Sequence, residues 1–222
     1  MLLRGSFDRH LHVLEKEVFA MGDMVDKALE NAMHALKNQD LKLAQQVIDD
    51  DALIDKKRIA IESQGVQLMV TQQPVASDLR IILSALYIAV DMERIADHAE
   101  GTARIALMIG NEPPLKPLID LPRMTDMVRD MLRRTLDALA RRDAECVRGI
   151  SAEDDNIDNI YDQVFRELLT FMIEDPRTIT RATRLMWAAH NLERSADHVT
   201  NICERVNFIV TGNFEEMRTS KY

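Results

Sequence analysis

Glycine, proline and aromatic residues are scarce in this chain. Its 222 residues include 7 glycines, 6 prolines and 5% aromatic side chains. Few residues therefore suit tight hairpins or pleated sheet faces, whereas the abundant Ala, Leu, Arg, Asp and Glu favour helices. With 46% hydrophobic and 29% charged residues, the chain is too apolar for a disordered protein. The composition predicts an all-α globular protein.

Cysteines and long apolar runs are also scarce. Cys146 and Cys203 are isolated and form no CxxC motif, which argues against a disulfide framework and a thiolate metal site. The most apolar uncharged run, Ile81 to Val90, is far shorter than the roughly 18 residues of a membrane-spanning helix. The N-terminus lacks the apolar core of a signal peptide. We expect a cytoplasmic protein that reaches a membrane only through its partners.

Basic runs and common catalytic motifs are missing as well. A formal net charge of -9 and the lack of a Lys/Arg cluster argue against a nucleic-acid partner. The chain contains no GxxxxGK[ST], GxGxxG, HExxH or GxSxG motif. No Glu is followed three residues later by His, as the carboxylate-bridged di-iron enzymes require. We expect a protein that is not an enzyme.

The prolines separate long helical patterns and divide the chain into two halves. Their densest group lies in GNEPPLKPLIDLP, from Gly110 to Pro122. Because proline interrupts helices and glycine ends them, we place the domain boundary there. The expected units are a first domain at 1–112, a second at 113–212 and a C-terminal tail at 213–222.

The two halves repeat one another. ERIADH at 93–98 matches ERSADH at 193–198, and Asp-Met-Val occurs at both 23–25 and 126–128. We interpret this as a duplication in which each half is an antiparallel three-helix bundle. The predicted helices are 8–38, 40–72, 77–109, 120–142, 144–174 and 177–211.

Carboxylates occur where the helix–helix seam should be apolar. In the third helix the series Leu79, Leu83, Leu86, Val90 continues at alternating spacings of four and three residues onto Glu93 and Asp97. Side chains at i and i+4 lie on one helix face, so two neighbouring helices bring two pairs together. The candidate ligands are Asp51, Asp55, Glu93 and Asp97 in the first half and Asp154, Asp158, Glu193 and Asp197 in the second.

Clustered, partly buried carboxylates repel one another and resist desolvation, so a multivalent cation would stabilise them. Oxygen ligands suit Fe, Mn or Mg, with Ca and Zn less favoured. Asn201 and Glu204 extend the acidic face of the second half, where the first half has Gly101 and Arg104. The second cluster should therefore be the richer in ligands.

Simpler interpretations of these residues compete with a metal site. Acidic helix faces are commonly solvated or paired with bases, and surface ion pairs are the expected fate of Glu62 and Asp162. Arg94 and Arg194 either neutralise the preceding glutamates or stay at the rim, and their position one residue off the seam favours the rim. His98 and His198 are expected to pack or cap rather than bind metal. The alternatives to a regulator are a metal enzyme or storage protein and a purely structural bundle.

Four segments resemble a known family. RGSFDRHLHVLEKEV at 4–18, QQPVASDLR at 72–80, DMERIADHAE at 91–100 and NLERSADHVTNICERV at 191–206 are similar to the PhoU family of phosphate-signalling regulators. Departures are Met92 in place of the usual Leu, alanine at 96 and 196 where the family often has Gly, and a first copy without the NIxE extension.

The resemblance implies a cytoplasmic two-bundle protein that binds multinuclear metal clusters through [DE]xxxD motifs, here at the eight carboxylates above and at Asn201 and Glu204. It also implies a negative regulator of phosphate uptake and of the phosphate-starvation response. The implied partners are the ATPase of a phosphate ABC transporter, a sensor histidine kinase and a second copy of the chain.

Overall fold

The computed structural model describes residues 2–217, and every regular element in that range is a helix. The first half contains α1 (Leu2–Asn38), α2 (Leu41–Gln72) and α3 (Ser77–Ile109). The second half contains α4 (Asp120–Arg141), α5 (Ala144–Ser151), α6 (Asp154–Glu174), the short 3₁₀ helix η1 (Pro176–Thr178) and α7 (Ile179–Thr211). The all-α prediction is confirmed. Part of the expected tail at 213–222 lies outside the described residues.

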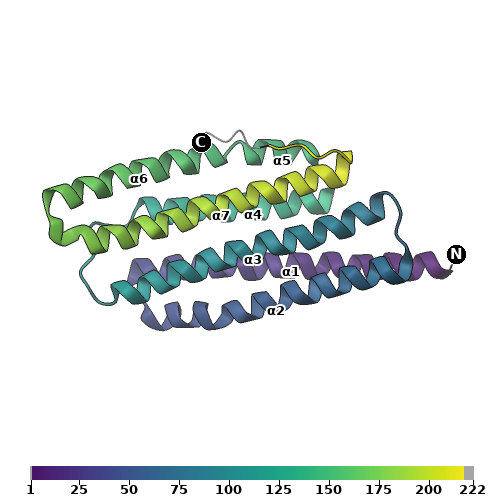
Figure 1. Cartoon of the computed structure of the whole chain (residues 1–222), viewed down its shortest axis with the longest axis horizontal. Coiled ribbons are helices and arrows are strands. Elements are labelled where there is room, and N and C mark those ends of the chain that lie inside the picture. The colour runs from purple at the N-terminus through teal and green to yellow at the C-terminus, as the bar shows by residue number, and fades with distance from the viewer. Residues whose placement is uncertain (1, 218–222) are drawn as a thin grey trace.

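The helices form two bundles that lie side by side (Figure 1). In the first bundle, α1, α2 and α3 all pack against one another, and in the second, α7 packs against α4, α5 and α6. The bundles meet along α3 and α7 and again along α1 and α4. The molecule is therefore elongated along the helix axes, and α3 and α7 lie at its centre.

Equivalent residues begin and end equivalent helices in the two halves. Asp40 and Asp143 precede α2 and α5, and their side chains accept hydrogen bonds from the backbone N–H groups of Leu43 and Cys146. Gly110 and Gly212 follow α3 and α7 with φ of 61° and 77°, a conformation that glycine adopts without strain. These shared caps support the duplication in the sequence.

The continuous helix expected at 144–174 is instead divided into α5 and α6 at residues 152 and 153. Here the Glu153 N–H donates to Ile150 O and the Asn156 N–H to Glu153 O, so the bonds span three residues rather than four. Arg134 of α4 also holds the Glu153 carboxylate through two hydrogen bonds of 2.7 and 2.9 Å. The break places Asp154 in the first turn of α6.

Polar contacts and a glycine bring α1 and α4 together. Arg129 of α4 donates to both carboxylate oxygens of Asp26 in α1, at 2.9 and 3.0 Å. A Cβ at Gly22 in α1 would collide with the Leu136 side chain of α4, so glycine permits the close approach of the two helices. This face and the α3–α7 contact hold the bundles in one arrangement.

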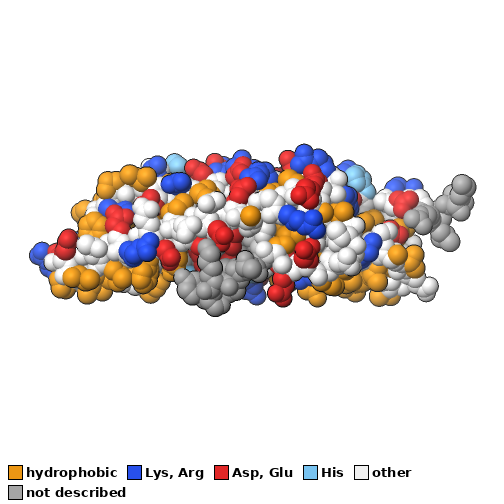
Figure 2. Space-filling model, turned by 90° about the horizontal axis from the view of Figure 1, so that it is seen from above, with side chains coloured by type: hydrophobic (Ala, Val, Ile, Leu, Met, Phe, Trp, Pro, Cys, Tyr) orange, Lys and Arg blue, Asp and Glu red, His pale blue; other side chains and the backbone are white. Residues whose placement is uncertain are grey.

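The surface mixes charge and apolar residues unevenly. Figure 2 shows acidic and basic side chains interspersed over the middle of the face seen from above, with hydrophobic side chains gathered towards both ends. Near the ends of α2 and α6, Val70 and Ile173 are 75% and 80% exposed. No helix in residues 2–217 is both long enough and apolar enough to span a membrane.

Candidate functional site

The structure brings the carboxylates of the first bundle together where α2 packs against α3. Burial, together with the negative charges of Glu100, Asp97, Asp55 and Glu93, raises the pKa of Asp51 to about 6. All four predicted residues therefore lie close enough to interact electrostatically. We call these five carboxylates the first cluster.

Glu93 is the more enclosed carboxylate of the α3 pair, with a side chain 13% exposed against 39% for Asp97. Burial raises its pKa, as does the charge of Asp97, while Arg94 and Arg58 oppose the shift. Arg94 Nε lies 3.4 Å from Glu93 Oε2, and its Nη1 lies 3.0 Å from Asp97 Oδ2. Arg94 thus lies at the rim, with a side chain 55% exposed, and pairs from there with both carboxylates, because Asp97 is about one turn further along the same helix.

Glu100 is the carboxylate of the first cluster that the sequence interpretation missed. Its position continues the alternating spacing of four and three residues through Glu93 and Asp97, and this signal was present in the sequence. Glu100 also forms an ion pair with Arg104 of the next turn. At the equivalent place the second half has Thr200, which is buried. At this position the first half therefore has a carboxylate that the second half lacks.

The second cluster comprises Asp154 and Asp158 on α6 with Glu193 and Asp197 on α7. Asp154 and Asp197 are 6% and 3% exposed, so carboxylates of this bundle lie deeper than Asp97 of the first. Arg194, whose side chain is 43% exposed, likewise lies at the rim and forms an ion pair with Asp197. Burial raises the pKa of Tyr161 on α6, and the negative charge of Glu193 adds to this rise. Glu193 therefore lies at the contact between α6 and α7.

Asn201 and Glu204 form hydrogen bonds with residues outside the second cluster. Asn201 Nδ2 donates to Asp91 Oδ1 of α3 at 3.1 Å, and Glu204 Oε1 accepts the backbone N–H of Met217 at 2.9 Å. The side chains that were expected to enrich the second cluster thus join it to α3 and to the C-terminal segment. Their role as additional metal ligands of the second cluster stays a prediction, and the first cluster has an additional carboxylate of its own, Glu100.

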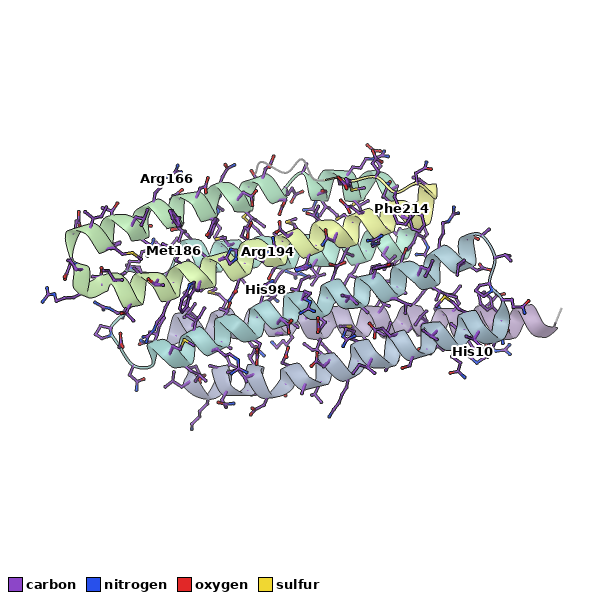
Figure 3. All side chains as sticks on the ribbon, viewed as in Figure 1. His10, His98, Arg166, Met186, Arg194 and Phe214 are labelled. Atoms are coloured by element: carbon purple, nitrogen blue, oxygen red, sulfur yellow. The ribbon has the colours of Figure 1, made fainter. Side chains whose placement is uncertain are left out.

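The two histidines lie at the contact between the bundles (Figure 3 labels His98 between α3 and α7). The rings of His98 and His198 have centroids 5.7 Å apart, and His198 Nδ1 lies 2.9 Å from Asp91 Oδ1. Burial, together with the nearby His198, lowers the pKa of His98 to about 4. The packing role expected of these histidines is what the structure shows. Asp91, which sequence reasoning passed over, accepts hydrogen bonds from α7 at this contact.

The donor chemistry of both clusters suits a hard cation. Crowded, half-buried carboxylates are oxygen donors whose mutual repulsion a cation relieves, and the raised pKa of Asp51 records that repulsion. Within residues 2–217, no group of three or more His, Cys, Asp or Glu side chains is arranged to hold a metal ion. The metal assignment therefore stays a prediction, and binding would require side chains to reorient.

Comparison with known proteins covers both bundles. The model of the PhoU domain matches residues 18–106 and again 121–206. The chain belongs to the PhoU family. A PhoU homologue of Rhizobium meliloti strain 1021, named a phosphate-specific transport system accessory protein, is 38% identical over 95% of this chain and 89% of its own length. A homologue of the same name from Pseudomonas putida is also 38% identical, over 93% of this chain and 81% of its own.

Solved PhoU structures share the arrangement of the bundles. The crystal structure of PhoU from Pseudomonas aeruginosa superposes with a TM-score of 0.89, at 36% identity over 93% of this chain and all of the other. That of the phosphate transport system regulatory protein PhoU from Streptococcus pneumoniae gives 0.88, at 30% identity over 94% and 99% of the two chains. The family resemblance seen in the four sequence segments is thus confirmed along almost the whole chain.

Proposed function

We propose that this chain is an accessory protein of a phosphate-specific transport system and that it restrains phosphate uptake and the phosphate-starvation response. The observation that supports this proposal is the similarity of both bundles, along 95% of the chain, to a protein named as a phosphate-specific transport system accessory protein. The regulator would act by binding other proteins.

The proposed partners are the ATPase subunit of the phosphate transporter and a sensor histidine kinase, both reached from the cytoplasm. Two bundles joined along two helix pairs form a stiff body with long helical faces. Such a body suits an adaptor, because distinct faces can contact different proteins without rearrangement of the core. A second copy of the chain is a further proposed partner.

We assign the metal-binding role to the clustered carboxylates. A bound divalent or trivalent ion would neutralise them and link two helices of a bundle. In the first bundle, Asp51 and Asp55 would contribute from α2, and Glu93 and Asp97 from α3. In the second bundle, Asp154 and Asp158 would contribute from α6, and Glu193 and Asp197 from α7. The ions would stiffen each bundle and so shape its docking faces.

The test is deletion of the gene in its host, with phosphate uptake and a phosphate-starvation reporter measured in phosphate-rich medium. We expect deletion to raise both, and the intact gene to restore them. Co-purification from cells grown in high and low phosphate should recover the transporter ATPase and the kinase with the chain. Uptake and reporter levels that deletion leaves unchanged would refute the proposal.

A further inference from the structure

A groove of about 350 Å³ runs along the surface of the first bundle between α1 and α2, the neighbouring helices at the base of Figure 1. Its floor is apolar and consists of Met24 and Ala28 from α1 with Val47 and Ile54 from α2. These residues recur at helical spacing on each helix, so the groove follows the helix axes for about two turns. A groove of this form accepts a further helix, which would convert the three-helix bundle locally into a four-helix bundle.

The floor is incompletely covered. Leu53, which lines the same groove, is 51% exposed, and Met24 is half-buried. Exposed apolar side chains at the centre of a groove with a polar rim are typical of sites where an amphipathic helix binds. The contacts that such a helix would make are with α1 and α2 at once.

The rim of the groove is acidic. Asp23 of α1 and Asp50 of α2 are exposed, and no basic side chain in residues 2–217 lies within ion-pair distance of either. Asp50 is the middle residue of a run of three aspartates, at 49–51. Lys27, the basic residue in the lining, is already paired with Glu30 at 2.7 Å. The unneutralised charge of the rim is therefore negative on both sides of the floor.

The duplication provides a second groove for comparison. The repeated Asp-Met-Val motif places Asp126 and Met127 of α4 in a surface hollow that also includes Asp130 and Glu153. In that hollow Arg134 pairs with Asp130 at 2.9 Å and with Glu153 at 2.7 Å. The second hollow thus contains the same Asp-Met motif, but Arg134 neutralises two of its carboxylates.

We propose that the α1–α2 groove docks an amphipathic helix of a partner protein. The apolar side of that helix packs on Met24 and Leu53, and its Lys or Arg side chains face Asp23 and Asp50. Charge complementarity selects a basic helix, and the net charge of -9 disfavours a second copy of this chain. The inference deepens the proposed function, on which it rests, because it assigns one face of the adaptor to a partner of defined chemistry.

The test uses the full-length chain and two synthetic peptides of about 18 residues, or five helical turns. Both contain the same Leu, Lys and Ala residues, but only the first orders them into an apolar stripe flanked by lysines. Fluorescence anisotropy at physiological ionic strength should detect binding of the first peptide and not of the scrambled one. Asp23→Lys with Asp50→Lys should weaken binding about ten-fold or more, since two attractive pairs become repulsive. The matched substitution Asp126→Lys in the second groove should change affinity less than about two-fold.

Thermal melting followed by circular dichroism checks that each variant folds. If charge reversal unfolds the bundle, the milder double variant Asp23→Asn with Asp50→Asn replaces it. A photo-crosslinker on the peptide should label residues of α1 and α2. Equal binding of both peptides, affinity unchanged in the groove variants, or crosslinks confined to other helices would overturn the proposal. Groove variants that lose the peptide but still restore phosphate control in the deletion strain would refute the docking role and leave the proposed function intact. Unchanged uptake after deletion would refute the function itself.

Discussion

Replacing Asp51 by asparagine should stabilise the metal-free protein at neutral pH. Asp51 lies where α2 meets α3, and burial together with four neighbouring carboxylates raises its pKa from 3.8 to about 6. At pH 7.5 the folded protein must hold this aspartate ionised in an unfavourable place. Asparagine has nearly the same shape and no charge, so it removes that cost.

The magnitude follows from the shift in pKa. A shift of this size corresponds to about 3 kcal/mol, and partial exposure to solvent reduces the effect to about 1–2 kcal/mol. Between pH 4 and 6 the folded chain keeps a proton that the unfolded chain has lost, so the free energy of unfolding falls as pH rises through this window. Above this pH window the free energy of unfolding has fallen by its full amount. For a protein of this size we expect Asp51→Asn to raise Tm by about 2–6 °C at pH 7.5 and to bring no gain below pH 4.

The assay is thermal unfolding of chelator-treated protein, followed by circular dichroism at several pH values from about 3.5 to 8, a range that extends below and above the window. Asp49→Asn is the matched control, because Asp49 is exposed and accepts a hydrogen bond from Gln45 at 2.8 Å outside the cluster. The control should leave Tm unchanged. A lower Tm for Asp51→Asn at pH 7.5, or a gain that persists at pH 3.5, would show that the carboxylates do not destabilise one another.

Three further outcomes are expected. If the first cluster binds metal, Mn²⁺ at about 100 times the Kd of the site should stabilise the chain by about 2.7 kcal/mol. Combined substitution of the four predicted ligands of the first cluster should abolish both that gain and the metal content found by mass spectrometry. Arg129→Ala should lower the free energy of unfolding in urea by about 1–3 kcal/mol, because it leaves the half-buried Asp26 without its bidentate partner, whereas the exposed Arg148→Ala should change it by less than about 0.5 kcal/mol. Glu204→Ala should speed hydrogen exchange at the Met217 amide about ten-fold while amides within α3 keep their rates, and an unchanged rate would mean that this hydrogen bond does not hold the C-terminal segment in solution.

The helices were predictable because their signals are local. Heptad spacing, the prolines between the helices and the capping aspartates Asp40 and Asp143 act within a few residues of the chain. The break between α5 and α6 has no comparable signal. It involves the carboxylate of Glu153 and the guanidinium of Arg134, which lie 19 residues apart in the chain and meet only when α4 packs beside the break.

The position of the carboxylates on the α2–α3 seam could also be predicted, because the spacing of four and three residues determines a helix face. The directions of individual side chains could not. Arg94 pairs with Glu93 and Asp97 of its own helix, and Asn201 turns to Asp91, a partner that only the packing of α7 against α3 supplies.

By itself, the sequence determined the helical class, the duplication and the stripe of carboxylates, which follow from composition and periodicity along one chain, and the family, which four of its segments resemble. The tertiary structure decided how the two copies differ. It added Glu100 to the first cluster, directed Glu204 to the C-terminal segment and paired Arg134 with Glu153 in the surface hollow of the second bundle. These differences depend on which side chains meet across helices, and that is set by packing in three dimensions rather than by spacing along the chain.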